Sequence, residues 1–338
     1  MWRATAITSY DVSVPEPVDL AAVRDAPDEF DAAVAVSPGI DRFCSSSAWI
    51  LAAHDALMGE RTPWLWRTEH GWLALARRSR SDGGVVLEPL ELAWGLASPL
   101  IGARPVALAR ELLAVAAGDA GWDAMLLAGL VEDGPADRAL IGGLPAGWRW
   151  GRGTPTQRYV ASLDGGVDGY LGRRSRNLRK ALRVGDRAAA AAGLSFVVVT
   201  PRTAPEIDDA LRRIVGIERR SWKGQGGVGI DQGPMLAFYQ RMTHALAPRG
   251  RMRLIVCRHH GRDIAFILGG VFAGEYRGLQ FSFDNTYRHH GLGNLLQLRQ
   301  IEALCEEDIG VYDLGTAMPY KERWAETVVE TRLLVIAR

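Results

Sequence analysis

The sequence contains few lysines and few cysteines, and it lacks a long uncharged apolar run. Three of its 40 basic residues are lysines, at positions 180, 223 and 321, a bias that we attribute to GC-rich codon usage. The three cysteines are odd in number and far apart, which argues against a disulfide framework and favours a reducing compartment. No stretch reaches the ~20 apolar residues of a membrane span, and the first residues lack the apolar core of a signal peptide. We therefore expect a cytoplasmic protein without a membrane span.

Acidic and basic residues nearly balance, and the formal net charge is +1. This balance excludes a protein whose affinity depends on an overall cationic field, such as a general DNA-coating protein. One local cluster departs from the average, because residues 173–183 include six basic side chains and no acidic one. The cluster indicates either a contact with a phosphate or polyanion or an ordinary solvated helix face, and both interpretations stay open.

The 338 residues, of which 48% are hydrophobic, suffice for one large domain or two of moderate size. Glycine and proline concentrate between residues 140 and 156, and this segment predicts a boundary between an N-terminal domain, 1–155, and a C-terminal domain, 156–338. Residues 1–40 have weak periodicity and predict a lead-in with one strand.

Hydrophobic periodicity predicts a similar order of helices and strands in the two halves, so that we expect an α/β fold with mixed (α+β) sheets. In the first half we expect a helix from residue 46, strands at 63–67, 71–76 and 85–94, a helix at 105–117 and a strand at 122–130. In the second half we expect a strand at 158–162, a helix at 167–192, a strand at 196–200, helices at 205–222 and 236–246, strands at 252–258, 263–272 and 276–283, a helix at 293–306, and strands at 310–314 and 330–337. We interpret the halves as two related modules.

One turn of the second half has the composition of an anion-binding loop. Residues 288–293 read Arg-x-x-Gly-x-Gly between a predicted strand and a predicted helix. Glycines let backbone N–H groups approach a phosphate, and a helix N-terminus adds about half a unit of positive charge. The spacing fits neither Gly-x-Gly-x-x-Gly nor the Walker pattern. We expect a phosphate cradle made by Arg288, His289, Gly291, Leu292, Gly293 and Asn294.

This turn resembles the pyrophosphate-binding loop of the GNAT acyltransferase superfamily, in which Arg/Gln-x-x-Gly-x-Gly/Ala follows a strand and holds coenzyme A. Residues 172–183, 218–224 and 312–324 are similar to segments of tandem-GNAT proteins, which include the Fem-type aminoacyl transferases and the CelD-like acyltransferases. The resemblance covers roughly residues 40–325 and is strongest from about residue 158. It implies two tandem GNAT-like modules, of which the second binds acyl-CoA as co-substrate. The first has no matching loop and would shape the acceptor cleft.

The resemblance implies an N-acyltransferase that moves an acyl group from acyl-CoA to an amine by direct attack in a ternary complex. The acceptor would be an amino sugar, a peptide lysine or another small amine. The chemistry needs a base for the amine and an acid for the thiolate, and the candidates are Glu218, Asp284, Asp313 and Tyr320. Candidates for substrate binding are Arg176, Trp222, Lys223, Lys321 and Trp324. We expect no metal, since no ligand set with suitable spacing is evident.

Purely structural roles for these residues stay open, namely loop capping for the aspartates, core packing for the aromatic residues and a solvated surface position for Lys321.

Two further functions also stay open. A Fem-type enzyme would use aminoacyl-tRNA, which the basic segment 173–183 would contact, although the second half has no coiled-coil insertion of the kind found in several such proteins. A non-catalytic module would bind acyl-CoA without transferring the acyl group.

Overall fold

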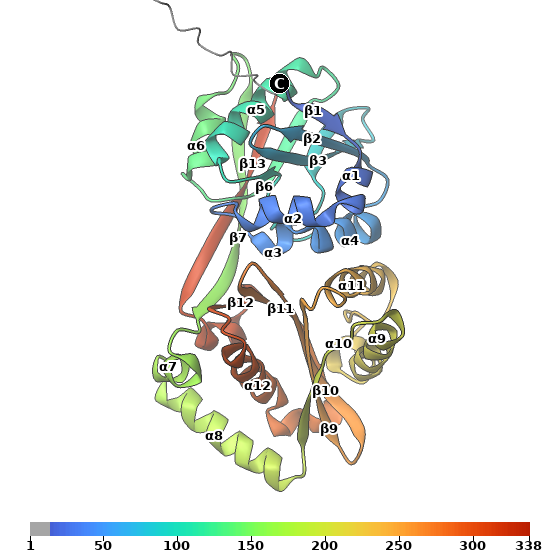
Figure 1. Cartoon of the computed structure of the whole chain (residues 1–338), viewed down its shortest axis with the longest axis vertical. Coiled ribbons are helices and arrows are strands. Elements are labelled where there is room, and N and C mark those ends of the chain that lie inside the picture. The colour runs from blue at the N-terminus through green and yellow to red at the C-terminus, as the bar shows by residue number, and fades with distance from the viewer. Residues whose placement is uncertain (1–13) are drawn as a thin grey trace, which may run out of the picture.

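The computed structural model describes residues 14–338, in which thirteen strands form one mixed sheet. The sheet has the order β1-β2-β3-β4-β6-β13-β7-β12-β11-β10-β9-β8, and β5 pairs with β3. Figure 1 shows two groups of elements along the long axis of the molecule, with the long strands β7 and β13 running from one group to the other. We call residues 14–148 the first module and residues 163–326 the second module. The α/β class with mixed sheets is therefore confirmed.

The first module combines a layer of short helices with half of the sheet. Its elements are β1 (Glu16–Val18), α1 (Leu20–Asp25), α2 (Pro27–Ala35), α3 (Arg42–Ser45), α4 (Ser47–Leu57), β2 (Thr62–Thr68), β3 (Gly71–Ser79), β4 (Val85–Pro89), β5 (Leu100–Ile101), α5 (Pro105–Gly118), β6 (Ala124–Leu130) and α6 (Pro135–Gly142). The expected lead-in contains the expected strand, β1, and in addition α1 and α2, which bury Val23 and Phe30 completely. The part of the lead-in before residue 14 lies outside the described residues.

The second module contains the longer helices. Its elements are α7 (Gly166–Gly172), α8 (Arg176–Ala191), β8 (Ser195–Val199), α9 (Ala204–Glu218), α10 (Trp222–Gln225), α11 (Gly233–Leu246), β9 (Met252–His259), β10 (Arg262–Phe272), β11 (Glu275–Phe283), the 3-10 helix η1 (Asn285–His290), α12 (Leu292–Glu306), β12 (Val311–Thr316) and the 3-10 helix η2 (Pro319–Trp324). The helix expected over 167–192 is interrupted before Ser175, whose side chain caps α8 by accepting a hydrogen bond from the N–H of Leu178.

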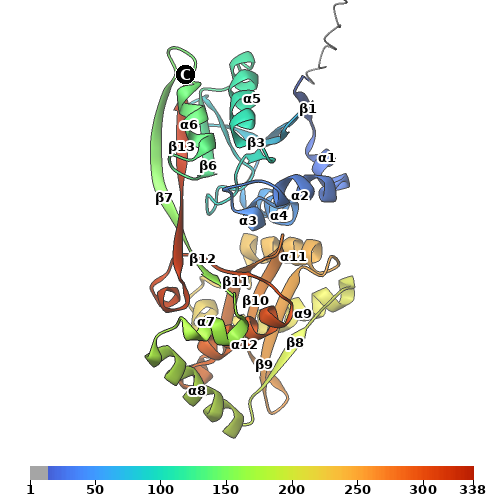
Figure 2. The same ribbon diagram turned by 60° about the vertical axis from the view of Figure 1, so that its left-hand side comes forward.

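Two long strands connect the modules by pairing across them. The strand β7 (Arg149–Ser162) leaves the first module and pairs with β12 of the second, whereas β13 (Thr327–Ala337) leaves the second module and pairs with β6 of the first. The two strands also pair with each other along their length, as Figure 2 shows from the side. The modules therefore exchange strands, and the predicted boundary at residues 155 and 156 falls within β7. The division into 1–155 and 156–338 stays a prediction.

The two modules repeat one arrangement of elements. An antiparallel meander, β2-β3-β4 or β9-β10-β11, leads to a helix, α5 or α12, and then to a strand parallel to the last meander strand. The parallel pairs are β4 with β6 and β11 with β12. The expected internal repeat is thus present in the architecture, and the site described below lies where β11 and β12 separate.

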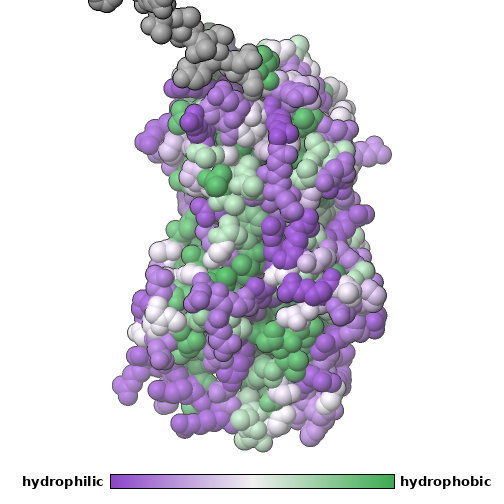
Figure 3. Space-filling model, viewed as in Figure 1, coloured by the Kyte–Doolittle hydropathy of each residue, from purple (hydrophilic) through white to green (hydrophobic). Residues whose placement is uncertain are grey.

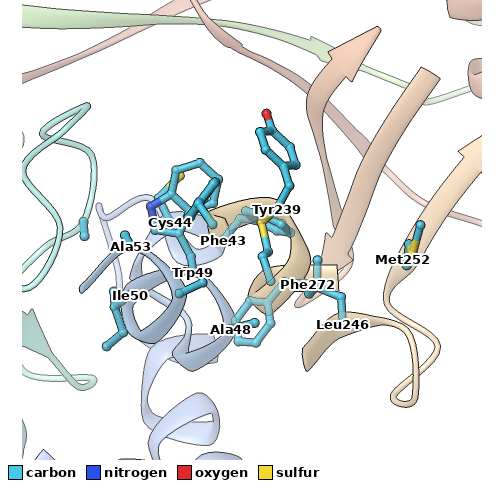
Figure 4. Packing of buried hydrophobic residues seen from close by; sticks show 14 of the residues in the cluster. Phe43, Cys44, Ala48, Trp49, Ile50, Ala53, Tyr239, Leu246, Met252 and Phe272 are labelled. Carbon is cyan, nitrogen blue, oxygen red and sulfur yellow. The ribbon is translucent and has the colours of Figure 1, made fainter. Parts of the chain in front are cut away.

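A single apolar core joins the modules. Figure 4 shows Phe43 and Trp49 from the first module beside Tyr239, Leu246 and Phe272 from the second. Trp49 lies on α4 and Tyr239 and Leu246 on α11, which contact each other, and α3 with Phe43 contacts β10, which ends at Phe272. Because burial of apolar surface is the main favourable contribution to folding, this shared core holds the two modules in a fixed relation. None of the helices in residues 14–338 has the length and apolar character needed to traverse a bilayer.

Candidate active site

The parallel strands β11 and β12 pair over only a short stretch and then separate. The pairing runs from Glu275 and Val311 to Arg277 and Asp313. Beyond it lies a hollow of about 330 Å³, including its open mouth, which we call the wedge pocket. Its wall residues are Ile267, Leu268, Gly278, Leu279, Gln280, Phe281, Gln297, Tyr312, Leu314, Tyr320 and Lys321. Figure 3 shows an apolar area over this part of the second module. Separated strands leave backbone N–H and C=O groups available to a substrate.

The predicted carboxylate Asp313 lies at the closed end of the wedge pocket, in a buried network of charges. Its Oδ2 accepts a hydrogen bond from Arg277 at 2.9 Å and also pairs with Arg158, and its Oδ1 accepts from the N–H of Gly315 at 2.7 Å. Arg277 also pairs with Asp41 of the first module. Burial alone would raise the pKa of Asp41, but the charges of Arg277 and Arg158 lower it. The network ties the base of the wedge pocket to the first module.

A second predicted carboxylate, Asp284, lies at the end of β11, outside the wedge pocket. Its Oδ2 accepts hydrogen bonds from Arg220 at 2.8 Å and Arg262 at 2.9 Å, and its Oδ1 caps η1 through the N–H of Thr286 at 3.1 Å. Burial would raise the pKa of Asp284, but the hydrogen bonds from Thr286 and Arg220 hold it below its usual value. The geometry therefore makes Asp284 an anchor for the turn that carries Arg288.

The third predicted carboxylate, Glu218, is fully buried behind the wall of the wedge pocket. Its Oε1 accepts hydrogen bonds from Gln280 Nε2 at 3.2 Å and from the N–H of Ile230 at 3.3 Å. Its Oε2 has no hydrogen-bond partner among the described residues. A buried carboxylate oxygen without a partner is energetically costly, which sets Glu218 apart from the two paired aspartates.

Tyr320 and Lys321 line the wedge pocket, and Lys223, which is not part of the lining, contacts two of its wall residues. Lys223 Nζ donates to Gln280 Oε1 at 3.1 Å and to the carbonyl of Phe281 at 2.8 Å, while Lys321 Nζ donates to the carbonyl of Thr316 at 2.9 Å. Burial lowers the pKa of both lysines, that of Lys321 to about 8. The Tyr320 ring packs edge-on against Phe281, and burial raises the pKa of Tyr320 to about 12. Its hydroxyl therefore keeps its proton at neutral pH.

The predicted cradle forms a second hollow, of about 560 Å³ with its open mouth, at the start of α12. Gly291 is the N-cap in a left-handed conformation, φ +63°; the N–H of Asn294 bonds to its carbonyl at 3.0 Å, which leaves the N–H groups of Leu292 and Gly293 without a partner in the helix. A Cβ at Gly293 would lie 2.9 Å from the ring of Phe281, so this close approach requires glycine. Phe281, Gln297 and Tyr320 line both hollows, which are therefore neighbours.

Two guanidinium groups flank this cradle. Arg288 is exposed and makes no hydrogen bond or ion pair with any described residue. Arg323, which the sequence analysis did not single out, donates to Asn294 Oδ1 at 2.7 Å from the η2 side. The predicted His289 and His290 lie on η1 with exposed side chains. Arg323 follows the Tyr320-Lys321 pair closely in the sequence, which could have drawn attention to it. The neighbouring residues do not, however, predict its contact with α12.

Other predicted substrate residues lie further from the two hollows. Arg176 is exposed at the start of α8, and Trp222 is 57% exposed on α10. Trp324 is 1% exposed and packs in the core of the second module, so only its edge reaches the cradle wall. Gln280 and Phe281 were not predicted, although each contacts Lys223 and lines the wedge pocket. Within residues 14–338 no group of three or more His, Cys, Asp or Glu side chains is arranged to hold a metal ion.

Comparison with known proteins agrees with this architecture. Residues 173–322 match the family model described as acetyltransferase (GNAT) domain. The chain is similar in structure to FemX, with a TM-score of 0.68 at 12% identity, covering 94% of this chain and 96% of that one. It is also similar to a conserved protein of unknown function from Bacteroides thetaiotaomicron VPI-5482, with a TM-score of 0.61 at 11% identity, covering 96% and 99% of the two chains. No curated protein matches.

A third similar structure is that of L-PGS from Bacillus licheniformis, with a TM-score of 0.56 at 13% identity, covering 91% of this chain and 90% of that one. At such identities a structural likeness shows the fold alone. Together with the family match, it confirms the resemblance expected from the sequence: the second module carries a GNAT domain, and the whole chain has a Fem-like fold of two GNAT-like modules. Acyl transfer is the class of reaction that this domain supports.

Proposed function

We propose that this protein is an N-acyltransferase that takes its acyl group from acyl-CoA and transfers it to an amine. The observation that carries the proposal is that the two hollows are neighbours. They share Phe281, Gln297 and Tyr320 in their walls, one lies between β11 and β12, and the other lies at a helix N-terminus flanked by Arg288 and Arg323. Such a helix start and two guanidinium groups without carboxylate partners suit a diphosphate, and the wedge suits a narrow thioester.

The residues present fit this co-substrate in a further respect. Neither Gly291 nor Gly293 carries a side chain over the first turn of α12, and nothing lies within 4 Å of the Cβ position at Gly291, so a phosphate can approach the backbone there. Acyl-CoA would supply a thioester activated for attack. Arg288, Arg323 and the N–H groups at the start of α12 would hold its phosphates, and the wall of the wedge pocket would enclose its reactive end.

The protein groups around the wedge suit a direct transfer. Transfer forms a C–N bond and breaks a C–S bond, so one proton leaves the acceptor nitrogen and one reaches the sulfur. In this proposal the protonated Tyr320 hydroxyl donates to the sulfur, and the proton that leaves the amine passes to water in the open pocket, while Glu218 acts behind the wall by holding Gln280 in place. Backbone N–H groups on the unpaired edge of β11 polarise the carbonyl.

Calorimetric titration with CoA and acetyl-CoA tests the cofactor assignment. Wild type should bind both, and Arg288→Gln should lose about 10- to 100-fold in affinity, the ~1.5–3 kcal/mol of a charged hydrogen bond. Arg176→Gln, which changes an exposed arginine outside both hollows, is the matched control. A ligand at 100 times its Kd should also add ~2.7 kcal/mol to the free energy of unfolding. No response to any CoA thioester from acetyl to long-chain would overturn the proposal.

Release of free thiol in the presence of amines tests the activity itself. A protein that binds CoA but releases no thiol with any amine would be a binding module without catalysis. In that case there would be no thiol-release activity for a substitution of Tyr320 or Glu218 to alter.

A second candidate, a Fem-type transferase that uses aminoacyl-tRNA, is favoured by the similarity to FemX and by the exposed basic face of α8. On that face Arg179 and Arg183 form no ion pair with any described residue. In contrast, Arg173 and Arg174 just before the helix are both paired with Glu326. An aminoacyl-tRNA should then bind with a steep salt dependence, and the double change Arg179→Glu and Arg183→Glu should abolish that binding while CoA affinity stays constant.

A further inference from the structure

Two of the three lysines in this chain contact the wall of the same pocket. Lys321, on η2, lines the wedge pocket, and Lys223, on α10, contacts the wall residues Gln280 and Phe281 from the other side. The remaining lysine, Lys180, lies on α8, away from both hollows. In a chain whose other basic residues are all arginines, the concentration of lysine at one site is a chemical feature of that site.

Both ammonium groups retain hydrogen-bonding capacity. A lysine ammonium has three donors, of which Lys223 uses two and Lys321 uses one within the described residues. Neither ammonium forms an ion pair with a carboxylate of residues 14–338, although most buried charges in proteins do. The unused N–H groups are therefore available to a ligand at the mouth of the wedge pocket.

The local charge balance is positive. Asp313, the nearest carboxylate at the closed end, is already paired with Arg158 and Arg277. Glu218 does not contact Lys223 directly, and the side-chain amide of Gln280 forms hydrogen bonds with both residues. Burial lowers the pKa of both lysines; the charge of Lys223 lowers the pKa of Lys321 further, while the charge of Glu218 opposes the shift of Lys223. An anion bound between the two lysines would offset both the burial and the neighbouring positive charge that lower their pKa values, because it would replace lost hydration with a direct charge contact.

We propose that Lys223 and Lys321 bind a compact anionic group of the acceptor, so that the preferred acceptor is an amine that also carries a carboxylate or a phosphate monoester. A lysine ammonium is a point charge on a flexible stem, which suits a small anion entering a narrow pocket better than a planar guanidinium does. Gln280, held from two sides by Glu218 and Lys223, fixes the orientation of the wall against which this group lies. The inference rests on the proposed N-acyl transfer.

Thiol-release kinetics with matched acceptors tests the inference. The pairs are pentylamine with 6-aminohexanoate and ethanolamine with O-phosphoethanolamine, which separate the carboxylate from the phosphate arm. Wild type should have a kcat/KM at least 10-fold higher for an anionic member than for its neutral partner. Lys223→Gln and Lys321→Gln should each raise KM for that anionic acceptor about 10-fold, so that the ratio of kcat/KM between the anionic and the neutral member of a pair falls toward one. Lys180→Gln is the matched control and should behave as wild type.

Calorimetry with CoA separates this inference from the proposed function. If both lysine variants bind CoA as wild type does and lose only the preference for anionic acceptors, the inference holds. Equal rates with charged and neutral acceptors would overturn it, and so would a loss of CoA affinity in the lysine variants, because the lysines would then serve the co-substrate. Absence of thiol release with every amine would instead count against N-acyl transfer itself. Thermal unfolding of each variant confirms that the fold is retained.

Discussion

The two modules place different side chains at equivalent positions of one arrangement. In the second module the helix after the meander begins with Gly291 and Gly293 and is flanked by two arginines. In the first module the corresponding helix, α5, begins with Pro105, which has no N–H to offer an anion. The hollow beside it, of about 520 Å³ with its mouth, has no charged residue in its lining. Each module therefore has a hollow at this place in the fold, and the side chains around each hollow determine which ligand can bind there.

The largest expected effect is a loss of stability when the buried ion-pair network between the two modules is disrupted. Asp41→Ala removes one of the two buried carboxylates that pair with Arg158 and Arg277 and leaves both guanidinium groups with Asp313 alone, an excess of one buried positive charge. Loss of one partner of a buried ion pair costs about 3–5 kcal/mol. We expect Tm to fall while unfolding remains a single transition, because the modules share a core. Asp82→Ala, in an exposed pair with Arg80, should change stability by less than about 1 kcal/mol. Two separate transitions in a calorimetric scan would contradict this view of the modules.

The next effect concerns the difference between the two helix starts. Gly293→Asp would place a side chain against Phe281 and a negative charge at the phosphate cradle. We expect CoA affinity to fall by more than about 100-fold, or ~2.7 kcal/mol, in a calorimetric titration. Gly151→Asp, on β7 with open space around it, is the control and should bind CoA normally. Undiminished binding by Gly293→Asp would remove the assigned difference between the modules.

A smaller effect follows from pH. The pKa of Lys321 is about 8, lowered first by burial and further by Arg277 and Lys223, while Asp313 opposes the shift. The ammonium is therefore charged below pH 8 and neutral above it. KM for an anionic acceptor should rise as pH increases through 8, by up to about 10-fold per unit. Lys321→Arg, which keeps its charge at every such pH, should abolish this rise. A pH profile that is unchanged in Lys321→Arg would assign the titration to another group.

The smallest effect concerns the apolar hollow of the first module. Val131, at its rim, is 39% exposed, and Val131→Arg should change stability by no more than about 0.5 kcal/mol. The new charge should not create a second CoA site, because Pro105 still lacks an N–H and no glycine pair follows it. The measured stoichiometry of CoA should stay at one per chain. A stoichiometry of two CoA molecules per chain would show that one added positive charge is enough to turn this hollow into a CoA site.

Local patterns predicted much of the second module. The helix expected over 293–306 begins one residue earlier, at Leu292, and the strands of the meander agree within one residue at most ends. Regular alternation and the Arg-x-x-Gly-x-Gly turn are properties of neighbouring residues, so the sequence displays them directly. The short helices α1, α2 and α6 were missed, because six to nine residues give too little periodicity to recognise.

The contacts that complete the site were not predictable in this way. β7 extends back to Arg149 through a segment that contains Gly151, Gly153 and Pro155, which local rules interpret as a break. It is a strand there because it pairs with β13. Similarly, Arg277 meets Asp41 across 236 positions of the chain. Such pairs depend on how whole helices and strands are arranged, and the residues next to either partner in the sequence do not predict them.

The exchange of strands has a consequence for the synthesis of the chain. The strand β13, which borders β6 in the sheet of the first module, is translated about 200 residues after β6. During that interval the edge of β6 has unpaired backbone groups and can pair with other chains. The first module is thus translated early but completed late. A nascent chain paused between the modules would be the form most exposed to aggregation, and the form for which protection by a chaperone would matter most.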